Sequence, residues 1–281
     1  MSNHKYLFKI YYIGKPKYFG SQRQPDFMSI EQCLLNALLK RGYINDIEKS
    51  KFEFASRTDR YVSARGACFT CVIEKKPILM EINSALPNEI GVWAHSEVPL
   101  QFTSRYNAIL RHYIYVVPFP ISFYRKLTGI NIHLIRKACR ELEGRHDFAN
   151  FSKKEDYNIN TTRNMDLVEV SIYDDYIFFQ FKSKAFLRQQ IRRIVKKLLE
   201  LGTGEITYED FLKLLNTSHK ISYQPADPRG LILWNIQFNK EIEFITDTKS
   251  KKRMNEFFIK NIIDYNFKNH LFRILQHDDF S

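Results

Sequence analysis

The chain has 281 residues, of which 44% are hydrophobic and 15% aromatic, so it can bury one large core or two smaller ones. Its 43 lysines and arginines outnumber 31 aspartates and glutamates, which gives a formal net charge of +12 at pH 7. This excess favours a polyanionic partner, with an anionic membrane surface as the alternative. The sequence has no long apolar run and no signal-peptide pattern, which excludes membrane-spanning and secreted classes and predicts a soluble, cytoplasmic protein.

The first part of the chain predicts an alternation of strands and helices. Residues 5–12 are β-branched and aromatic, which is typical of a strand. Ser29, with Gln32 three residues later, resembles a capping box, and Gly42 ends the helix that follows. The expected elements are a strand at 5–12, a helix at 29–41, strands at 52–55 and 67–73, and a short helix at 82–86.

The next part of the chain repeats this order. Asp174-Asp175 separates two alternating apolar runs, which predicts a hairpin. Apolar residues recur with helical spacing from Ala185 to Leu201, which predicts the most regular helix of the chain. The expected elements are a strand at 111–117 ended by Pro118, a helix at 131–142, hairpin strands at 168–172 and 176–181, helices at 185–201 and 206–215, and a strand at 231–238.

The order strand–helix–strand–strand occurs twice, which predicts an α+β fold of two pseudo-equivalent halves. Their largely antiparallel sheets are expected to join and to form a central groove, with the helices on the outer face. We expect an N-terminal half at residues 1–104 and a C-terminal half at residues 105–238. Residues 239–281 are expected to form a helical extension, to which the sequence assigns no chemistry.

The segment Arg57-Thr58-Asp59-Arg60-Tyr61-Val62-Ser63 lies between two predicted strands and places one carboxylate among arginines. A lone carboxylate at a strand end is usually a turn or cap residue. In a strongly basic and aromatic-rich chain, this arrangement instead indicates chemistry on a nucleic acid. Asp59 is therefore the first candidate for a reacting group.

Basic residues of the predicted 185–201 helix lie opposite its apolar stripe. A solvated helix face is the usual interpretation of such a run. No acidic residue stands between Asp175 and Glu200, so the face is unbalanced and phosphate contact is favoured. Aromatic residues interleaved with basic ones also suit unstacked RNA bases. The residues expected to contact RNA are Arg23, Arg105, Arg111, Arg188, Arg193 and Lys196.

The sequence predicts neither a metal site nor a nucleotide-binding loop. Cys68 and Cys71 have the spacing of a metal knuckle, but side chains three residues apart in a strand face opposite sides. The phosphate-loop and dinucleotide motifs are absent from the sequence. His146 and Asp147 could form an acid–base pair, but adjacent residues on an irregular loop rarely address one substrate atom. A structural or RNA-contacting role is therefore favoured for them.

Six motifs, in order from about Tyr6 to Phe238, resemble those of the tRNA pseudouridine synthase A family. Residues 56–64 resemble the family's Gly-Arg-Thr-Asp-x-Gly-Val-His/Ser-Ala. One such motif is weak evidence, whereas six in order over most of the chain are specific. The other matching segments are residues 20–24, 104–108 with 111–115, 144–148, 185–187 with 191–192, and 225–226 with 230–233.

The resemblance implies the pseudouridine synthase fold and the isomerisation of uridine to pseudouridine in the anticodon arm of tRNA, without metal or cofactor. It places the nucleophile at Asp59, the uracil-stacking tyrosine at Tyr113 and the arginine that pairs with the nucleophile at Arg192. Arg57 falls on an arginine that helps to hold the base out of the stack. Family members often dimerise, so a homodimer is one expectation. The alternative function is a non-catalytic tRNA-binding or folding protein derived from this family.

Three positions depart from the family pattern near the predicted nucleophile. Tyr61 and Ser56 replace glycines, and Ser21 replaces a tryptophan. If position 61 requires a positive φ, a tyrosine there is strained. The loop is then expected to have another shape.

Overall fold

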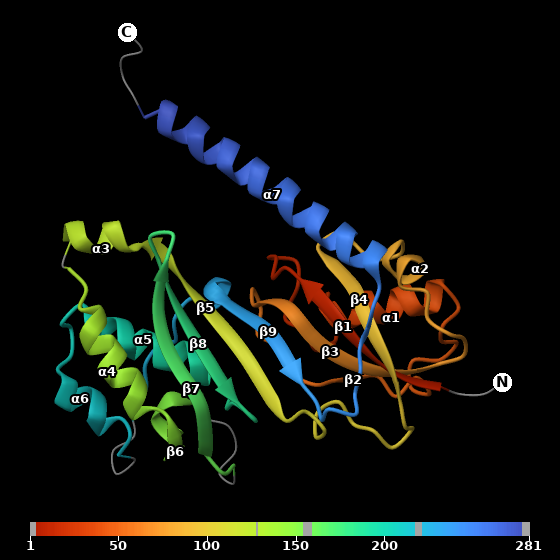
Figure 1. Cartoon of the computed structure of the whole chain (residues 1–281), viewed down its shortest axis with the longest axis horizontal. Helices are drawn as coiled ribbons and strands as arrows, with labels where there is room; N and C mark the ends of the chain where they lie inside the picture. The colour runs from red at the N-terminus through yellow and green to blue at the C-terminus, as the bar shows by residue number, and fades with distance from the viewer. Residues whose placement is uncertain (1–3, 128, 154–158, 217–220, 277–281) are drawn as a thin grey trace.

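The structure, a computed structural model, describes residues 4–127, 129–153, 159–216 and 221–276. Across these ranges one sheet runs through the whole molecule in the order β10-β4-β1-β3-β9-β5-β8-β7-β6, and β2 pairs with β3. Figure 1 shows this sheet with α1 and α2 at one end and α4, α5 and α6 at the other. The strands are β1 (His4–Tyr12), β2 (Glu53–Phe54), β3 (Ser63–Ile73), β4 (Ile90–Val98), β5 (Leu110–Pro120), β6 (Gly144–Asp147), β7 (Thr162–Tyr173), β8 (Tyr176–Ser183), β9 (Leu231–Gln237) and β10 (Ile245–Thr246).

The late strand β9 joins the two predicted halves. It pairs parallel with β3 and antiparallel with β5, and every other strand pair of the described sheet is antiparallel. The α+β class, the largely antiparallel sheet and the joining of two sheets are therefore confirmed. The division at residues 104 and 238 stays a prediction, because the sheet is continuous across the first boundary and β10 of the last segment pairs with β4.

Helices pack against both ends of this sheet. The helix α1 begins where Ser29 accepts a hydrogen bond from the N–H of Gln32, as expected for an N-cap. The Gln32 side chain contacts Asn36 instead of returning to Ser29, so only half of a capping box forms. The helices are α1 (Ile30–Lys40), α2 (Leu79–Asn83), α3 (Ile121–Leu127), α4 (Ile132–Glu141), α5 (Gln190–Gly202), α6 (Tyr208–Lys213) and α7 (Thr248–Ile274).

Several expected boundaries were wrong. The helix expected from Ala185 begins at Gln190, because Gln189 adopts φ 61° and the preceding residues form a loop. The strand β5 continues past Pro118 to Pro120, through an irregular stretch of its pairing with β8. The strand β4 was not predicted, and β6 contains His146 and Asp147, where a loop was expected. The hairpin at Asp174 is confirmed, with positive φ there and at the next residue.

The cysteines of the Cys-x-x-Cys pair both lie in β3, as expected. Cys68 and Cys71 are fully buried, and burial raises the pKa of each thiol to about 12. Thiols in this state are small apolar core residues rather than reactive groups.

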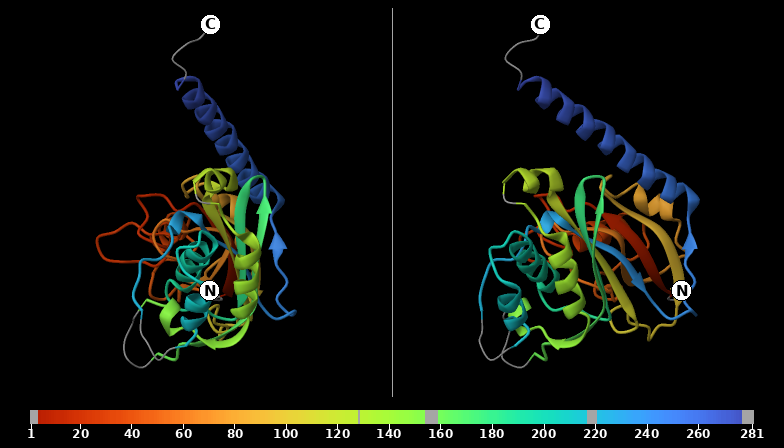
Figure 2. Two further views of the ribbon diagram at one scale, coloured as in Figure 1. Left: turned by 90° about the vertical axis from the view of Figure 1, so that its left-hand side faces the viewer. Right: turned by 60° about the vertical axis from the view of Figure 1, so that its left-hand side comes forward.

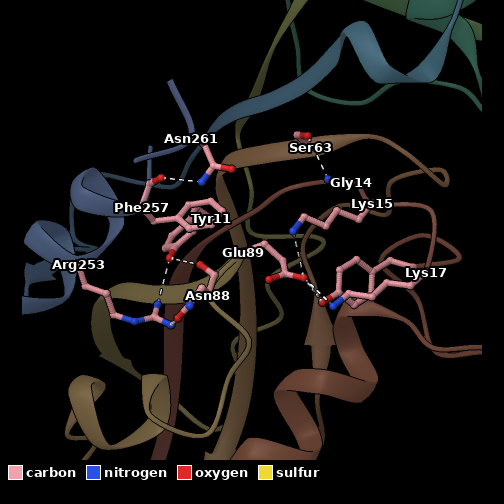
Figure 3. A network of polar contacts seen from close by, with 11 residues as sticks. Tyr11, Gly14, Lys15, Lys17, Ser63, Asn88, Glu89, Arg253, Phe257 and Asn261 are labelled. Atoms are coloured by element: carbon pink, nitrogen blue, oxygen red, sulfur yellow. Dashed lines mark hydrogen bonds and ion pairs between the residues drawn. The ribbon is translucent and has the colours of Figure 1, made fainter. Parts of the chain in front are cut away.

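The C-terminal helix α7 is anchored at its beginning and projects from the body afterwards. Arg253 donates hydrogen bonds to the hydroxyl of Tyr11 and to Asn88 (Figure 3). Met254, the next residue, is fully buried. Beside this anchor, Glu89 contacts Lys15 and Lys17 (Figure 3). Burial alone would raise the pKa of Glu89, but these lysines and other hydrogen bonds lower it to about 2.

Beyond this anchor α7 is solvent-exposed. Residues 262–276 are all exposed, and the views of Figure 2 show α7 extending away from the sheet. Within the described residues, no helix combines the length and the apolar character needed to cross a membrane.

Candidate active site

The loop that carries Asp59 connects β2 to β3 and is held by the segment before α1. The N–H of Thr58 donates to the hydroxyl of Ser21 at 2.8 Å, and the N–H of Ser21 donates to the carbonyl of Thr58 at 3.1 Å. The hydroxyls of Tyr12 and Thr58 share a further hydrogen bond of 2.8 Å. Three contacts to one residue fix the backbone immediately before Asp59.

Two glycines allow the backbone of the Asp59 loop to pack closely against the segment before α1. A Cβ at Gly14 would fall 2.2 Å from the carbonyl carbon of Tyr61, and a Cβ at Gly20 would fall 2.8 Å from the carbonyl oxygen of Thr58. Either side chain would push the loop away from its present position. The loop is therefore fixed by steric contact as well as by hydrogen bonds.

Asp59 is paired with Arg192 across the two predicted halves. One carboxylate oxygen of Asp59 lies 2.9 Å from a terminal guanidinium nitrogen of Arg192. The Nε of Arg192 donates to the carbonyl of Ala226 at 2.7 Å, which fixes the guanidinium. The Asp59 side chain is 37% exposed, whereas that of Arg192 is 10% exposed. The second carboxylate oxygen is therefore left for a substrate.

Tyr113 lies beside this pair on β5. Its ring is buried and meets Phe186 edge to face, with 5.2 Å between ring centroids. Burial raises the pKa of Tyr113, the charge of Asp59 acts in the same direction, and a hydrogen bond with Ser56 opposes them. The phenol is therefore neutral at physiological pH and keeps its proton.

These residues line one cleft of about 980 Å³ that both halves of the chain form. Its walls are strongly basic, with two acidic side chains besides Asp59 among the residues that the structure describes. A cleft of this size accommodates a nucleotide. The arginines that line it are Arg57, Arg60, Arg105, Arg111, Arg163, Arg188 and Arg192, and the two further acids are Glu31 and Glu53.

Comparison with known proteins agrees with this geometry. Residues 138–239 match the model of a family described as tRNA pseudouridine synthase. The tRNA pseudouridine synthase A of Methanothermobacter thermautotrophicus is 32% identical over 249 residues, which cover 89% of this chain and 86% of the relative. The chain belongs to the tRNA pseudouridine synthase A family. The proteins of the same name from Archaeoglobus fulgidus and Pyrococcus furiosus are 33% and 34% identical, and the alignments cover 89% and 87% of both chains in each pair. Pseudouridine synthases are isomerases, so the chain is classed as one.

The structure separates the basic residues of this tRNA pseudouridine synthase A family member into exposed and buried groups. Arg57, Arg105 and Arg188 are exposed and line the cleft, and Arg23 is exposed on the loop before α1. Arg57 makes no side-chain hydrogen bond or ion pair within the described part of the chain, so its guanidinium is available to a ligand. All four side chains are exposed, so an incoming polyanion can reach them from solvent.

Arg111 is used inside the protein. It is 7% exposed, and its guanidinium donates to Ser56, to the carbonyls of Ala55 and Arg105, and to the carbonyl of Lys184. Burial lowers the pKa of Arg111. Arg111 therefore connects the Asp59 loop to the segment after β8. This position favours a structural role over the phosphate contact that we expected.

The basic face of α5 also differs from the expectation. Arg193 is buried, with its guanidinium 5.1 Å from the ring centroid of Tyr223. Lys196 and Lys197 both pair with Glu200, at 3.1 Å and 2.7 Å. Glu200 offsets one of these two lysine charges, so the face keeps a positive excess, and a phosphate contact by Lys196 stays a prediction.

Sequence reasoning missed some residues that line the cleft, and the two residues it considered as an acid–base pair do not line it. Arg60 and Arg163 line the cleft, although no motif singled out either for binding. His146 contacts the carbonyl of Glu143, and Asp147 accepts hydrogen bonds from Ala149 and Thr161. These local contacts favour the structural role for His146 and Asp147.

Tyr61 has a left-handed backbone conformation, which glycine adopts more readily than other residues. Its φ is 70°, a region that costs an L-residue about 1–2 kcal/mol. Its ring lies 4.9 Å from the guanidinium of Arg60, measured to the ring centroid. The positive φ considered for this position is therefore present, whereas a loop shape that differs from the family's stays a prediction. The N–H of Gly14 donates to the hydroxyl of Ser63 at 3.1 Å, which holds the backbone two residues after Tyr61.

This strain predicts the order of stability of two variants. Tyr61→Gly is expected to be more stable than Tyr61→Ala by about 1 kcal/mol in urea unfolding, because both lose the ring but only alanine keeps a Cβ at positive φ. Tyr106 is exposed and has no positive φ, so Tyr106→Gly should be less stable than Tyr106→Ala. If Tyr61→Ala is more stable than Tyr61→Gly, as expected for the variants at Tyr106, the left-handed conformation at Tyr61 does not lower stability.

Proposed function

We propose that this chain isomerises uridine to pseudouridine in the anticodon arm of tRNA, with Asp59 as the nucleophile and without a cofactor. The observation that carries the proposal is the 2.9 Å contact between Asp59 and Arg192 in the basic cleft. Family membership supports the reaction, the relatives named above are tRNA pseudouridine synthases, and the motif resemblance implies the anticodon arm.

The chemistry needs a carboxylate and no external electrons. The bond between N1 and C1′ of uridine breaks, a bond between C5 and C1′ forms, C5 loses its proton and N1 gains one, so no atom is gained or lost overall. The target nucleotide must leave the helix before its glycosidic bond can be reached. A carboxylate can attack C1′, or add at C6 of the uracil, and is released later in both cases. Arg192 fixes one oxygen of Asp59 and leaves the other for this attack.

Tyr113 is proposed to contact the uracil ring and to handle the proton at C5. A tyrosine offers a flat apolar face to a base and a hydroxyl that can transfer a proton. Phe186 holds the ring from its edge, and burial keeps the phenol protonated by raising its pKa. Ser56, which replaces a glycine of the family pattern, supports both the phenol and Arg111.

The exposed arginines of the cleft are proposed to bind the phosphates of tRNA. Arg57, Arg105 and Arg188 line the cleft, and Arg23 lies on the exposed loop beside it. Contacts of this kind release counterions, so tRNA affinity falls steeply as the salt concentration rises. Lys196 is half-exposed and can reach a phosphate only in competition with Glu200.

Pseudouridine mapping tests the proposal directly. Purified protein is incubated with unmodified tRNA transcripts, and pseudouridines are located by carbodiimide modification followed by primer extension. We expect pseudouridine within the anticodon arm of at least one tRNA, and full activity after treatment with a chelator. If the protein binds tRNA tightly yet makes no pseudouridine in any transcript, the non-catalytic tRNA-binding function replaces this proposal.

A further inference from the structure

The loop before α1 carries a layered stack of side chains at the rim of the cleft. The rings of Phe27 and Phe19 are stacked, with 4.2 Å between centroids and 28° between planes. The guanidinium of Arg60 also lies on the ring of Phe19, and its central carbon is 3.9 Å from the centroid of that ring. Phe19 and Arg60 line the cleft, and Arg60 directly follows Asp59 in the chain.

We propose that Phe27 is a stacking surface for an unpaired nucleobase that neighbours the target uridine. Phe27 is 48% exposed although one face is covered by Phe19, so its exposed area lies on the outer face and the edges. Residues 22–28 of this loop are all exposed, and they include Arg23. An exposed aromatic face beside arginines is the arrangement on which single-stranded bases stack, whatever their sequence. The inference rests on the proposed function, because it assigns a further contact to the same substrate.

The loop holds Phe27 in place before any ligand arrives. Gln24 and Phe27 form a β-bridge around a turn with Pro25 at its second position and Asp26 at φ 61°, the signature of a type II turn. The side chain of Gln24 donates to the carbonyl of Phe19 at 2.6 Å, and the N–H of Phe19 donates to the carbonyl of Met28 at 2.8 Å. An aromatic ring fixed in this way loses little conformational entropy when a base stacks on it.

The same loop is tied to the nucleophile, so the distance between the two is fixed. Ser21 exchanges hydrogen bonds with Thr58, and Arg60 donates to the carbonyl of Pro16 at 2.7 Å. Phe27 stacks on Phe19, which lines the same cleft as Asp59, so a neighbour of a uridine bound at Asp59 is the base proposed to reach Phe27.

The test compares Phe27→Ala and Phe27→Trp with wild type on a tRNA that wild type modifies. We expect about tenfold weaker tRNA binding and a similar loss of single-turnover conversion at subsaturating RNA for Phe27→Ala, with recovery in Phe27→Trp. Phe119→Ala is the matched control, because Phe119 is 50% exposed and stacks on Phe123 at 4.9 Å. Phe123 does not line the cleft, whereas Phe19, on which Phe27 stacks, does. Thermal melts of all variants confirm that each is folded.

RNA with single abasic sites identifies the base. The effect of Phe27→Ala should disappear when the base removed is the one that stacks on Phe27, and it should persist for abasic sites elsewhere in the loop. If Phe27→Ala binds and reacts as wild type does, or if its defect persists on every abasic RNA, the stacking inference is overturned, while conversion by wild type still supports the proposed function. If wild type converts no uridine in any tRNA, the proposed function fails, and the assignment of the stacked base as a neighbour of the target uridine fails with it.

Discussion

Asp59→Asn is expected to abolish pseudouridine formation while leaving the fold and the affinity for tRNA nearly unchanged. Asparagine keeps the size of the side chain but removes the negative charge and almost all nucleophilicity. Phosphate contacts from other residues supply most of the affinity, so binding survives. We expect the single-turnover rate on an unmodified tRNA to fall by roughly 10⁴-fold or more, to the limit of detection.

The matched control for this variant is Asp227→Asn. Asp227 also pairs with an arginine, Arg229, and its side chain is 31% exposed, close to the 37% of Asp59, but it does not line the cleft. This variant should convert tRNA at a rate within about threefold of wild type, since it removes a charge from outside the site. Near wild-type conversion by Asp59→Asn would mean that Asp59 is structural and that the proposed mechanism is wrong.

Local sequence patterns predicted most elements, but the centre of the sheet depends on contacts between distant segments. Periodicity alone identifies β9 as a strand, yet it gives no reason to insert that strand between β3 and β5. Asp59 and Arg192 are 133 residues apart, and only the motif resemblance indicated that they meet. The positions of Cys68 and Cys71 in a buried strand, by contrast, followed from local pattern.

Charge patterns proved a poor guide to which arginines face solvent. Arg105 and Arg111 belong to one basic–aromatic stretch, but the first is exposed and the second is buried and donates to Ser56 and to three backbone carbonyls. A guanidinium has donors enough to satisfy several backbone carbonyls, so an arginine can be an internal tie. The pairing of Lys196 with Glu200 was accessible from the sequence, because the two residues have the four-residue spacing of helical ion pairs.

The three departures from the family pattern are absorbed by specific contacts. Ser21 accepts the N–H of Thr58, and Ser56 accepts a hydrogen bond from Arg111. Tyr61 keeps a positive φ and contacts Arg60 with its ring. Each replacement residue therefore makes its own contact within or beside the Asp59 loop.

Arg111→Met is expected to lower the free energy of unfolding by about 3 kcal/mol or more. Methionine fills part of the space but leaves the carbonyls of Ala55 and Arg105 without their buried donor. Arg111→Lys should restore little of this loss, because a single ammonium cannot reproduce the fork that reaches Ser56 and the carbonyls together. Urea unfolding of the purified variants measures both changes, and conversion of tRNA should fall with the displacement of the Asp59 loop.

Arg105→Met is the comparison that distinguishes a structural arginine from one that contacts a phosphate. The Arg105 side chain is exposed, so its loss should change the free energy of unfolding by less than about 0.5 kcal/mol. If Arg105 contacts a phosphate, the slope of log affinity against log salt concentration should fall by about one unit in this variant. The two variants should therefore have different defects. Arg111→Met should lose stability, and Arg105→Met should lose part of the salt dependence of tRNA binding. If Arg111→Met instead has wild-type stability and a salt slope lower by about one unit, Arg111 contacts a phosphate. A guanidinium that only holds the loop cannot be removed without lowering the free energy of unfolding.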